Sequence, residues 1–299
     1  MSKDSKPGGD RAGADIERIE RATLAAVPPA ASIERDGWLL GFDPGTVGRA
    51  RSAVPLRHDI ADPALLPELE AEYLRRGLVP RFRLPIDAPA FDPVADRLRG
   101  AGYRPNRPTQ VLRAPVAMLV AASDVADAGA GRGDGAPGDT DIVLLERSAS
   151  DAWAAVYLGE GFDPVDGRSR VALLRRAAEA CYAGIRLSRA TAGSAAGAAA
   201  GELAAVGCAC FAFDLLGIHG MRTRPALRGR GLARRLIAAM AGAASRRGIA
   251  EAYLQVDGDN PAQSLYARLG FAPAWRYVYW ERPAATPAAV PAVAVPAVL

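Results

Sequence analysis

The 299-residue sequence has little lysine, histidine or cysteine, and each shortage excludes a class of site. Of its 37 basic residues only two are lysines, so the many arginines reflect composition and are weak evidence for phosphate binding. The two histidines, His58 and His219, cannot supply a multi-histidine zinc site. Three cysteines in so long a chain make no disulfide framework, and we expect them to be small buried side chains. No metal site is predicted.

Long apolar runs and an excess of one charge are also lacking. The 37 basic residues nearly balance 33 acidic ones, for a net charge of +4, which argues against a nucleic-acid partner. No run of about 18 apolar residues is free of charge and proline, so no contact with a membrane is expected. The first residues contain no apolar segment typical of a secretory signal. We therefore expect a soluble, cytoplasmic protein.

Low-complexity segments divide the chain. Residues 1–13 are polar and are predicted to be a disordered tail, whereas 284–299 form a Pro/Ala-rich tail whose prolines forbid a continuous helix. Gly, Asp and Pro dominate 127–140, so we predict a linker over 121–139. The remaining segments, 14–120 and 140–283, are each long enough for a domain.

Hydrophobic periodicity is clearest in 140–283, where it predicts mixed α/β structure. Strands are expected at 141–146, 182–187, 206–213, 215–223, 251–256 and 275–280. Helices are expected after Ser150, over 169–180, from Leu232 onward and over 262–268. Gly248 stands where a glycine would end the helix that begins near Leu232.

An internal repeat predicts that the two halves share one fold. The segments 98–115 and 266–283 align at an offset of 168, which places Gly102 opposite Gly270. A second block, 76–78, resembles 247–249 and precedes an apolar stretch in both places. Two similar blocks in the same order favour a duplicated domain, with chance similarity as the alternative.

A glycine-rich turn at 228–234 stands between a predicted strand and a predicted helix. Such a turn leaves backbone N–H groups unpaired at a helix start, where the helix dipole adds partial positive charge, so it suits a phosphate or pyrophosphate. A P-loop would need lysine and serine or threonine where Leu232 and Ala233 stand, and a dinucleotide fingerprint would need glycine at Arg234. Both of those motifs are absent, and a plain helix-start turn remains the alternative.

Two segments together resemble the GNAT N-acetyltransferase superfamily. Arg228-x-x-Gly231-x-Ala233 is similar to its [Q/R]-x-x-G-x-[G/A] acyl-CoA motif, and 260–271 is similar to its N-x-x-A/S-x-x-x-Y-x-x-x-G-F segment. The resemblance implies an α/β (α+β) fold of two tandem GNAT-like domains, each a mixed, mainly antiparallel sheet flanked by helices. It also implies acetyl-CoA as the co-substrate.

The resemblance also implies roles for single residues. Tyr266 would stand near the CoA sulfur as general acid, since the departing thiolate needs a proton or a hydrogen-bond donor. Residues implied to contact CoA, through the main chain of a strand and of the turn or through one side chain, are Met221, Thr223, Arg228, Gly229, Arg230, Gly231, Leu232, Ala233, Arg234 and Asn260. A helix-packing aromatic is the alternative for Tyr266.

The general base is poorly marked. His219 lies on the strand before the turn and is the candidate, because histidine titrates near neutrality; strand alternation would put it on the same side as Met221 and Thr223. Asp214, Glu202 and Asp257 are further candidates, and relatives that use a chain of water molecules need no base.

The first half lacks the acyl-CoA motif and has Leu98 where the second half has Tyr266. We therefore predict a degenerate N-terminal copy that does not bind CoA and that forms part of the wall of the acceptor site.

The leading hypothesis is an N-acetyltransferase that transfers acetyl directly from acetyl-CoA to an amine of a small molecule or peptide, through a ternary complex. The alternatives are a non-catalytic acyl-CoA-binding sensor and an interaction scaffold. A tandem copy can imitate a dimer, so both monomer and homodimer remain open.

Overall fold

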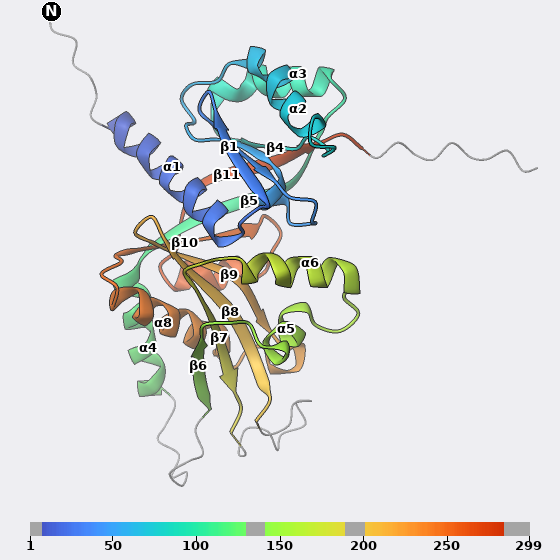
Figure 1. Cartoon of the computed structure of the whole chain (residues 1–299). Helices are drawn as coiled ribbons and strands as arrows, with labels where there is room; N and C mark the ends of the chain where they lie inside the picture. Colours follow the sequence, from blue (N-terminus) through green and yellow to red (C-terminus); the bar gives the residue numbers. More distant parts are fainter. Residues whose placement is uncertain (1–7, 130–140, 189–200, 284–299) are drawn as a thin grey trace, which may run out of the picture.

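The computed structural model describes residues 8–129, 141–188 and 201–283, and Figure 1 shows how their helices and strands are arranged. The strands are β1 (Ala31–Arg35), β2 (Trp38–Phe42), β3 (Ala53–Pro55), β4 (Phe82–Pro85), β5 (Arg104–Pro115), β6 (Ile142–Glu146), β7 (Ala180–Arg186), β8 (Leu203–Ala212), β9 (Leu215–Thr223), β10 (Glu251–Asp257) and β11 (Ala272–Glu281). The helices are α1 (Gly8–Ala26), α2 (Leu66–Leu74), α3 (Asp92–Gly100), α4 (Val116–Gly129), α5 (Asp151–Leu158), α6 (Pro164–Arg175), α8 (Leu232–Ser245) and α9 (Gln263–Arg268). Short 3-10 turns are η1 (Gly48–Arg51), η2 (Pro63–Leu65), η3 (Pro89–Phe91) and η4 (Pro225–Leu227).

All the described strands belong to one sheet, in the order β1-β2-β3-β4-β11-β5-β10-β9-β8-β7-β6. Most neighbours are antiparallel, but β3 with β4 and β9 with β10 are parallel. The sheet is flanked by helices on both sides (Figure 1), so the predicted mixed, mainly antiparallel α/β fold is confirmed.

The two halves exchange their closing strands, which the sequence analysis did not anticipate. In the repeat, β5 corresponds to β11, yet β5 pairs with β10 and β11 pairs with β4. The two exchanged strands also pair with each other, from Ala272 opposite Arg113 to Glu281 opposite Arg104. Because of this exchange, Trp280 of β11 packs into the core formed by α2, α3 and the strands of the first half.

The second half buries both faces of its strands, and the two faces pack against different helices. On one face, Leu216 and Ile218 of β9 share a core with residues of α4, α8 and α9. On the other face, Leu215 packs with Ile19 of α1. Helices α5 and α6 cover the rest of this second face, where Trp153 is 1% exposed and donates from Nε1 to the carbonyl of Ala183 at 3.0 Å.

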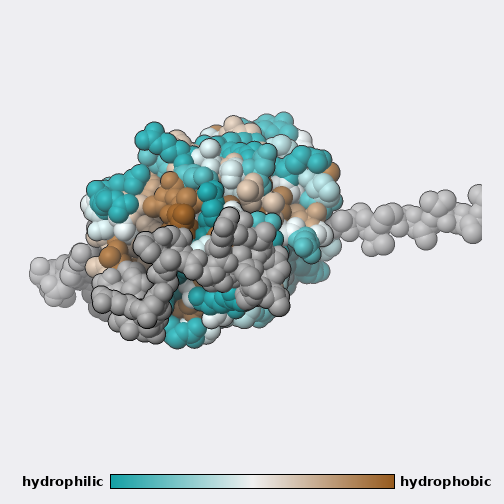
Figure 2. All heavy atoms as spheres, turned by 90° about the horizontal axis from the view of Figure 1, so that it is seen from below, coloured by the Kyte–Doolittle hydropathy of each residue, from teal (hydrophilic) through white to brown (hydrophobic). Residues whose placement is uncertain are grey.

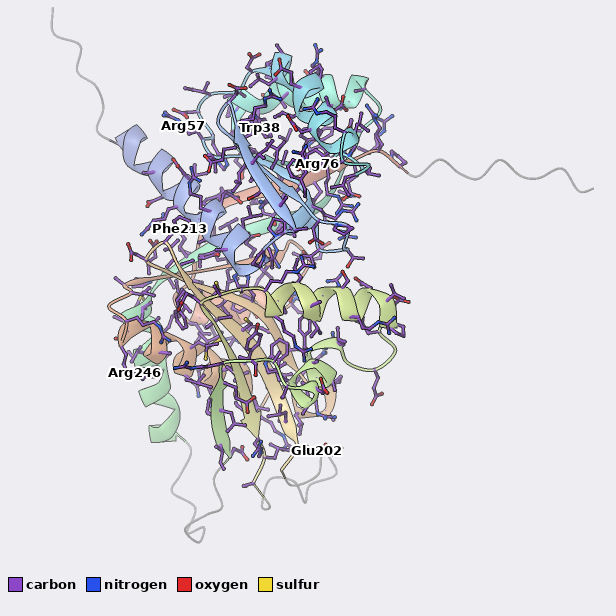
Figure 3. All side chains as sticks on the ribbon, viewed as in Figure 1. Trp38, Arg57, Arg76, Glu202, Phe213 and Arg246 are labelled. Atoms are coloured by element: carbon purple, nitrogen blue, oxygen red, sulfur yellow. The ribbon has the colours of Figure 1, made fainter. Side chains whose placement is uncertain are left out.

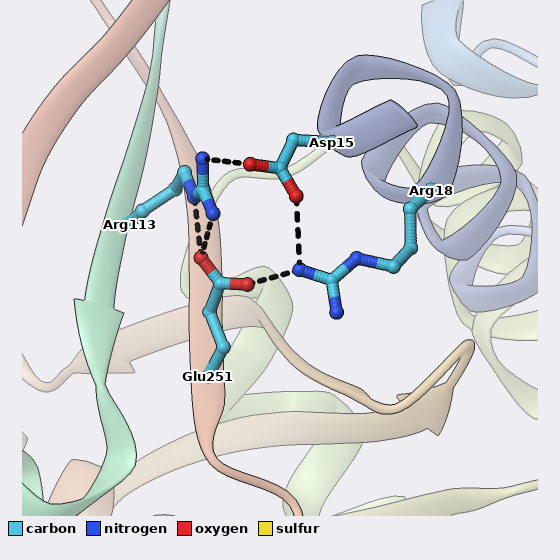
Figure 4. Close-up of polar contacts among 4 residues, drawn as sticks. All are labelled: Asp15, Arg18, Arg113 and Glu251. Atoms are coloured by element: carbon cyan, nitrogen blue, oxygen red, sulfur yellow. Dashed lines mark hydrogen bonds and ion pairs between the residues drawn. The ribbon is translucent and has the colours of Figure 1, made fainter. Parts of the chain in front are cut away.

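Helix α1 is tied to the junction of the halves by ion pairs. Arg113 of β5 and Glu251 of β10 form an ion pair, and Arg18 of α1 binds the same carboxylate. Asp15 lies 3.0 Å from Nη1 of Arg113 and 3.3 Å from Nη2 of Arg18, which closes the network (Figure 4). Because these groups are partly buried, they are screened less than an exposed pair and fix α1 across both halves.

Several local predictions are confirmed by capping contacts. Ser150 Oγ accepts from the Trp153 N–H at 3.2 Å and caps α5. Gly248 has φ +73°, and the Ile249 N–H returns to the Ala244 carbonyl at 3.1 Å, as at a glycine-terminated helix. Helix α6 begins earlier than predicted, because Asp163 caps it by accepting from the Asp166 N–H at 2.7 Å.

Helices extend into two segments predicted to be irregular. Helix α1 begins at Gly8, within the predicted tail 1–13, and α4 continues to Gly129, within the predicted linker 121–139. Alanine-rich composition accounts for the extension of α4, because alanine has the highest helix propensity. Residues 8–13 of α1 contain three glycines and one alanine, so composition does not account for that extension. Residues 130–140, 189–200 and 284–299 lie outside the described residues, so the remaining linker, a predicted loop and the predicted C-terminal tail stay predictions.

The face seen from below in Figure 2 carries hydrophilic residues beside a hydrophobic patch. Strand β6 is at the edge of the sheet and exposes Ile142 and Leu145. In the described part of the chain, no helix is both long and apolar enough to cross a membrane.

Candidate acyl-CoA site

Strands β9 and β10 separate part of the way along their length. They pair in parallel from Leu215 opposite Glu251 to Ile218 opposite Leu254, and no pairing follows. Strand β9 continues for five further residues, to Thr223, and β10 continues to Asp257. The backbone groups on the facing edges beyond Ile218 are therefore not used by the sheet. We call the opening between these strands the splay.

A bulge in β9 begins two residues beyond the last residue paired with β10. The register with β8 shifts between Val206 opposite Arg222 and Cys208 opposite His219, and Gly220 in the bulge has φ +59°. A Cβ at Gly220 would lie 3.2 Å from Tyr157 of α5, so glycine serves both the conformation and the close approach.

The bulge reverses the alternation of side chains along β9. Met221 packs on the α8 face with Ile218, whereas His219 contacts Tyr253 on the face that α1 covers, with ring centroids 5.8 Å apart. The prediction that His219 shares a side with Met221 and Thr223 is therefore wrong for Met221, because it assumed regular alternation through Gly220. Arg222 follows the bulge and returns to the face of His219.

The glycine-rich turn after β9 leads into α8 without a capping side chain. Gly229 and Gly231 have φ +79° and +74°, and Gly231 is the N-cap residue of α8. No side chain accepts from the first N–H groups of the helix, and residues 228–231 are exposed. Uncapped N–H groups and the positive end of the helix dipole face solvent here, which is the arrangement that binds a phosphate.

The side chains of the turn have mixed environments. Leu232 is 4% exposed and anchors α8 in the core, while Ala233 is partly buried at the first turn of the helix. Arg228 and Arg230 are exposed, and Nε of Arg234 is buried without a hydrogen-bond partner among the described residues. The other end of this guanidinium lies beside the helix start, since Nη2 of Arg234 would be 3.9 Å from a Cβ on Gly231, and can donate to an anion there.

Tyr266 lies in the core beneath the splay, on the same face as Met221. Its side chain is 8% exposed and meets Phe271 edge-on, with ring centroids 5.8 Å apart. Burial raises the pKa of its phenol above 10.0, so it remains protonated at neutral pH. Asn260 is exposed, and its Oδ1 accepts from the Ala262 N–H at 2.9 Å at the start of α9.

His219 is almost fully buried at the closed end of the splay. It is 4% exposed, and neither ring nitrogen has a hydrogen-bond partner in the described structure. Burial, and to a smaller extent the charge of Arg49, lowers the pKa of His219 to about 3. The imidazole is therefore neutral at pH 7, the form that accepts a proton, but it holds that proton weakly.

The other acidic candidates lie away from the closed end of the splay. Asp214 is in the β8–β9 turn with φ +54°, next to Phe213, and Figure 3 shows Phe213 at the opposite end of β8 from Glu202. Glu202 lies 3.6 Å from Arg224 and lines a cavity of about 290 Å³ beside α5. Asp257 is exposed at the open end of β10, where its carbonyl accepts from Gln263 at 3.0 Å.

The corresponding place in the first half is built differently. Strands β3 and β4 are also parallel, but they pair only at Ala53 opposite Phe82. The following η2 turn is capped by Asp62, whose carboxylate accepts from the Ala64 N–H at 2.8 Å. The η2 turn runs directly into α2, which like α8 has no side-chain cap of its own, so the two halves differ in the turn ahead of the helix: a carboxylate caps it in the first half, and two glycines form it in the second.

No cluster of residues that could hold a metal ion is found among the described residues. Cys208 and Cys210 are 1% and 3% exposed and lie on the same face of β8 as Val206.

One segment of the first half reaches this region although its sequence did not predict that contact. Residues 43–51 connect β2 to β3 in the first half, yet they pack against the second half. Ala50 is fully buried in the core that contains Trp153, and Arg176 binds Asp43 at 2.6 Å. No local pattern marks this role, because the contacts that join the segment to the second half are distant in sequence.

A splayed pair of parallel strands, a bulge and an uncapped turn before a helix together define the fold of the GNAT N-acetyltransferases, as the sequence motifs indicated. A family model described as "probable histone acetyltransferase Rv0428c C-terminal" matches residues 13–280, so the chain belongs to that family. No curated protein matches the sequence.

Solved structures support the same fold. A GCN5-related N-acetyltransferase from Kribbella flavida has a TM-score of 0.62 at 18% identity, over 90% of this chain and 96% of that one. A functionally unknown conserved protein from Staphylococcus epidermidis has a TM-score of 0.60 at 11% identity, over 88% and 99%. A tandem GNAT protein from the clavulanic acid biosynthesis pathway has a TM-score of 0.50 at 15% identity, over 92% and 98%.

Proposed function

We propose that this protein is an acetyl-CoA-dependent N-acetyltransferase that transfers acetyl directly to an amine of a small molecule or peptide. The observation that carries the proposal is the junction of the β9–β10 splay with the uncapped start of α8. Unused strand edges suit the amide groups of pantetheine, and the open helix start suits the pyrophosphate.

The CoA contacts follow from this placement. Main-chain N–H groups between Arg228 and Arg234 would bind the pyrophosphate, with Arg234 as an additional donor. Met221 and Thr223 would offer their main chain to pantetheine. Asn260 would reach the CoA arm with its amide nitrogen, because its oxygen is already used at the start of α9.

The reaction needs no covalent enzyme intermediate. The amine nitrogen forms a bond to the thioester carbonyl carbon, and the carbon–sulfur bond then breaks. Tyr266 would give its proton to the departing thiolate and regain one from solvent. Main-chain N–H groups at the bulge would polarise the carbonyl. The amine proton would leave to water, because His219, whose ring nitrogens are buried and whose pKa is about 3, is too weak a base to accept it.

A second candidate function is acyl-CoA binding without catalysis, as a sensor. The burial of His219 and its low pKa favour this alternative, because an efficient base has a pKa near the working pH. Release of free thiol from acetyl-CoA in the presence of a diverse set of amines distinguishes the two, since a sensor gives no amine-dependent release.

The turn is tested by the pair Gly231→Asp and Gly231→Asn. Asparagine and aspartate tolerate a left-handed backbone similarly and have the same size, so only the charge differs. At about 100 times the dissociation constant, acetyl-CoA should stabilise the wild type by about 2.7 kcal/mol, which shifts Tm by several degrees. The shift should be largely lost in Gly231→Asp and mostly kept in Gly231→Asn, as measured by thermal unfolding with and without acetyl-CoA.

No acetyl-CoA shift in the wild type at millimolar ligand would contradict both the enzyme and the sensor. Equal loss in the two variants would show that the site depends on glycine itself and not on an anion at the helix start.

A further inference from the structure

The acceptor amine must approach the splay from the face opposite to CoA. The α8 turn, Met221 and Tyr266 belong to the α8 face, where the proposed CoA contacts lie. The opposite face carries His219, Tyr253 and helices α1 and α5. The acceptor is therefore assigned to this opposite face, which CoA does not occupy in the proposed complex.

Arg49 of the first half is fixed on this acceptor face. Its neighbour Ala50 is fully buried in the same core as Trp153 of α5. On its other side, Gly48 is so close to Tyr279 of β11 that a Cβ there would lie 2.9 Å from the ring. The turn that carries Arg49 is thus held between α5 and β11, two elements of the second half.

The charge of Arg49 acts on titratable groups of several elements on this face. It acts on the pKa of His219 on β9, Tyr157 on α5 and Tyr253 on β10. It also acts on Glu20 of α1. It acts on Tyr277 of β11 as well. The position of its turn, between the core of Trp153 and the ring of Tyr279, places Arg49 among these elements.

Arg49 nevertheless has no hydrogen bond or ion pair with any described residue, although it is partly buried. The nearest acid in this group, Glu20, is already paired with Arg83 at 2.9 Å, and both side chains are 1% exposed. A guanidinium that is partly removed from water gains most from a carboxylate, which it binds in a planar two-point arrangement.

A second unpaired arginine lies on the same face. Arg222 follows the bulge, and its Nη2 would be 2.5 Å from a Cβ placed on Gly159, the residue that ends α5. Arg222 has no ion pair or hydrogen bond in the described structure. Arg170 is also near Tyr157, but it is paired with Asp166 at 3.0 Å. The acids of the neighbouring α5–α6 loop, Asp163 and Asp166, cap or pair within α6.

We propose that Arg49, supported by Arg222, binds a carboxylate of the acceptor, so that the preferred substrates are amines that also carry an acidic group. This inference rests on the proposed acetyl transfer. It places a specificity-determining residue in the first half of the chain, and it disfavours lysine-rich peptides, whose positive charge both arginines would repel.

The test compares pairs of amines that differ only in the acid. Amino acids and their carboxamides, together with a cationic lysine peptide, are assayed by thiol release with the wild type, Arg49→Gln and Arg49→Lys. Arg246→Gln is the matched control, since Arg246 is exposed at the far end of α8 (Figure 3).

In the wild type we expect kcat/KM for the best acid to exceed that of its carboxamide by at least about tenfold. Arg49→Gln should raise KM for the acid by roughly 10–100-fold. The KM for the carboxamide and the KM for acetyl-CoA should stay unchanged, so the preference for the acid over its carboxamide should be abolished. Arg49→Lys should restore part of it, and Arg246→Gln should behave as wild type.

The shift of Tm caused by acetyl-CoA, measured for every variant, distinguishes a failure of the carboxylate site from a failure of the proposed acetyl transfer. If acetyl-CoA stabilises the protein but acids are turned over no better than carboxamides, or the lysine peptide is preferred, the carboxylate site is wrong and acetyl transfer stands. An equal loss for acid and carboxamide in Arg49→Gln also overturns it. If acetyl-CoA gives no shift in the wild type, acetyl transfer itself is wrong, and this inference falls with it.

Discussion

A single residue, Gly220, determines which side chains of β9 face each side of the splay. Its positive φ allows a bulge, so Met221 points to the α8 face while His219 and Arg222 point to the acceptor face. A regular strand would have placed His219 and Met221 together. The chemistry of the proposed acceptor face thus depends on this backbone conformation as well as on the identities of its polar residues.

The burial of His219 should make stability depend on pH. Its pKa is about 3 in the folded protein and near 6.5 when unfolded, so the unfolded state binds more protons between these values. The free energy of unfolding should therefore fall as pH drops below about 6.5, by at most about 1.4 kcal/mol per pH unit from this group. In urea unfolding between about pH 7 and pH 4.5, the free energy of unfolding should depend less steeply on pH for His219→Gln than for the wild type.

His58 provides the comparison for this prediction. Burial lowers its pKa to about 4, so His58→Gln should flatten the same dependence, and the double variant should be flatter than either single one. A dependence equal to that of the wild type in the double variant would contradict the proposed origin of the pH effect.

Tyr266→Phe tests the general acid. The hydroxyl has no hydrogen bond to a described residue, so its removal should change the free energy of unfolding by less than about 0.5 kcal/mol. Loss of a proton donor should lower kcat by about 100-fold or more in the thiol-release assay. Because burial raises the phenol pKa, loss of wild-type activity through ionisation of this group should begin at a higher pH than for an exposed phenol. Unchanged kcat in Tyr266→Phe would assign the ring to packing alone.

At the scale of elements, local patterns predicted most strands and helices of the second half but not which strands pair. The turn at Gly229 and Gly231, the cap at Ser150 and the end at Gly248 depend on nearby residues, so the sequence was sufficient for them. The partners of β5 and β11 could not be predicted, because the repeat makes the two strands similar in pattern and either could close either half. Arg49 was missed for a related reason, since its turn is positioned by contacts with the other half.

At the scale of the molecule, the exchange of β5 and β11 makes the halves mutually dependent. Each half alone would leave β10 or β4 without its antiparallel partner and would expose part of its core, including the site of Trp280. The ion pairs of Arg113 with Asp15 and Glu251 add a further link between β5, α1 and β10 (Figure 4). The active arrangement proposed here, with Arg49 from one half and the splay from the other, is therefore a property of the whole chain.

This dependence predicts that a break in the connection between the halves leaves the protein assembled. A protease site inserted within 131–139 should be cleavable, yet the two pieces should co-elute, because their strands alternate in one sheet. Urea should unfold the uncut protein in one cooperative transition observed by both fluorescence and circular dichroism, since neither half retains a closed core without the other. The control is the same insertion left uncut. Separation of the pieces in buffer, or two transitions with distinct midpoints, would show that each half closes its own sheet, and would remove the structural basis for a shared acceptor site.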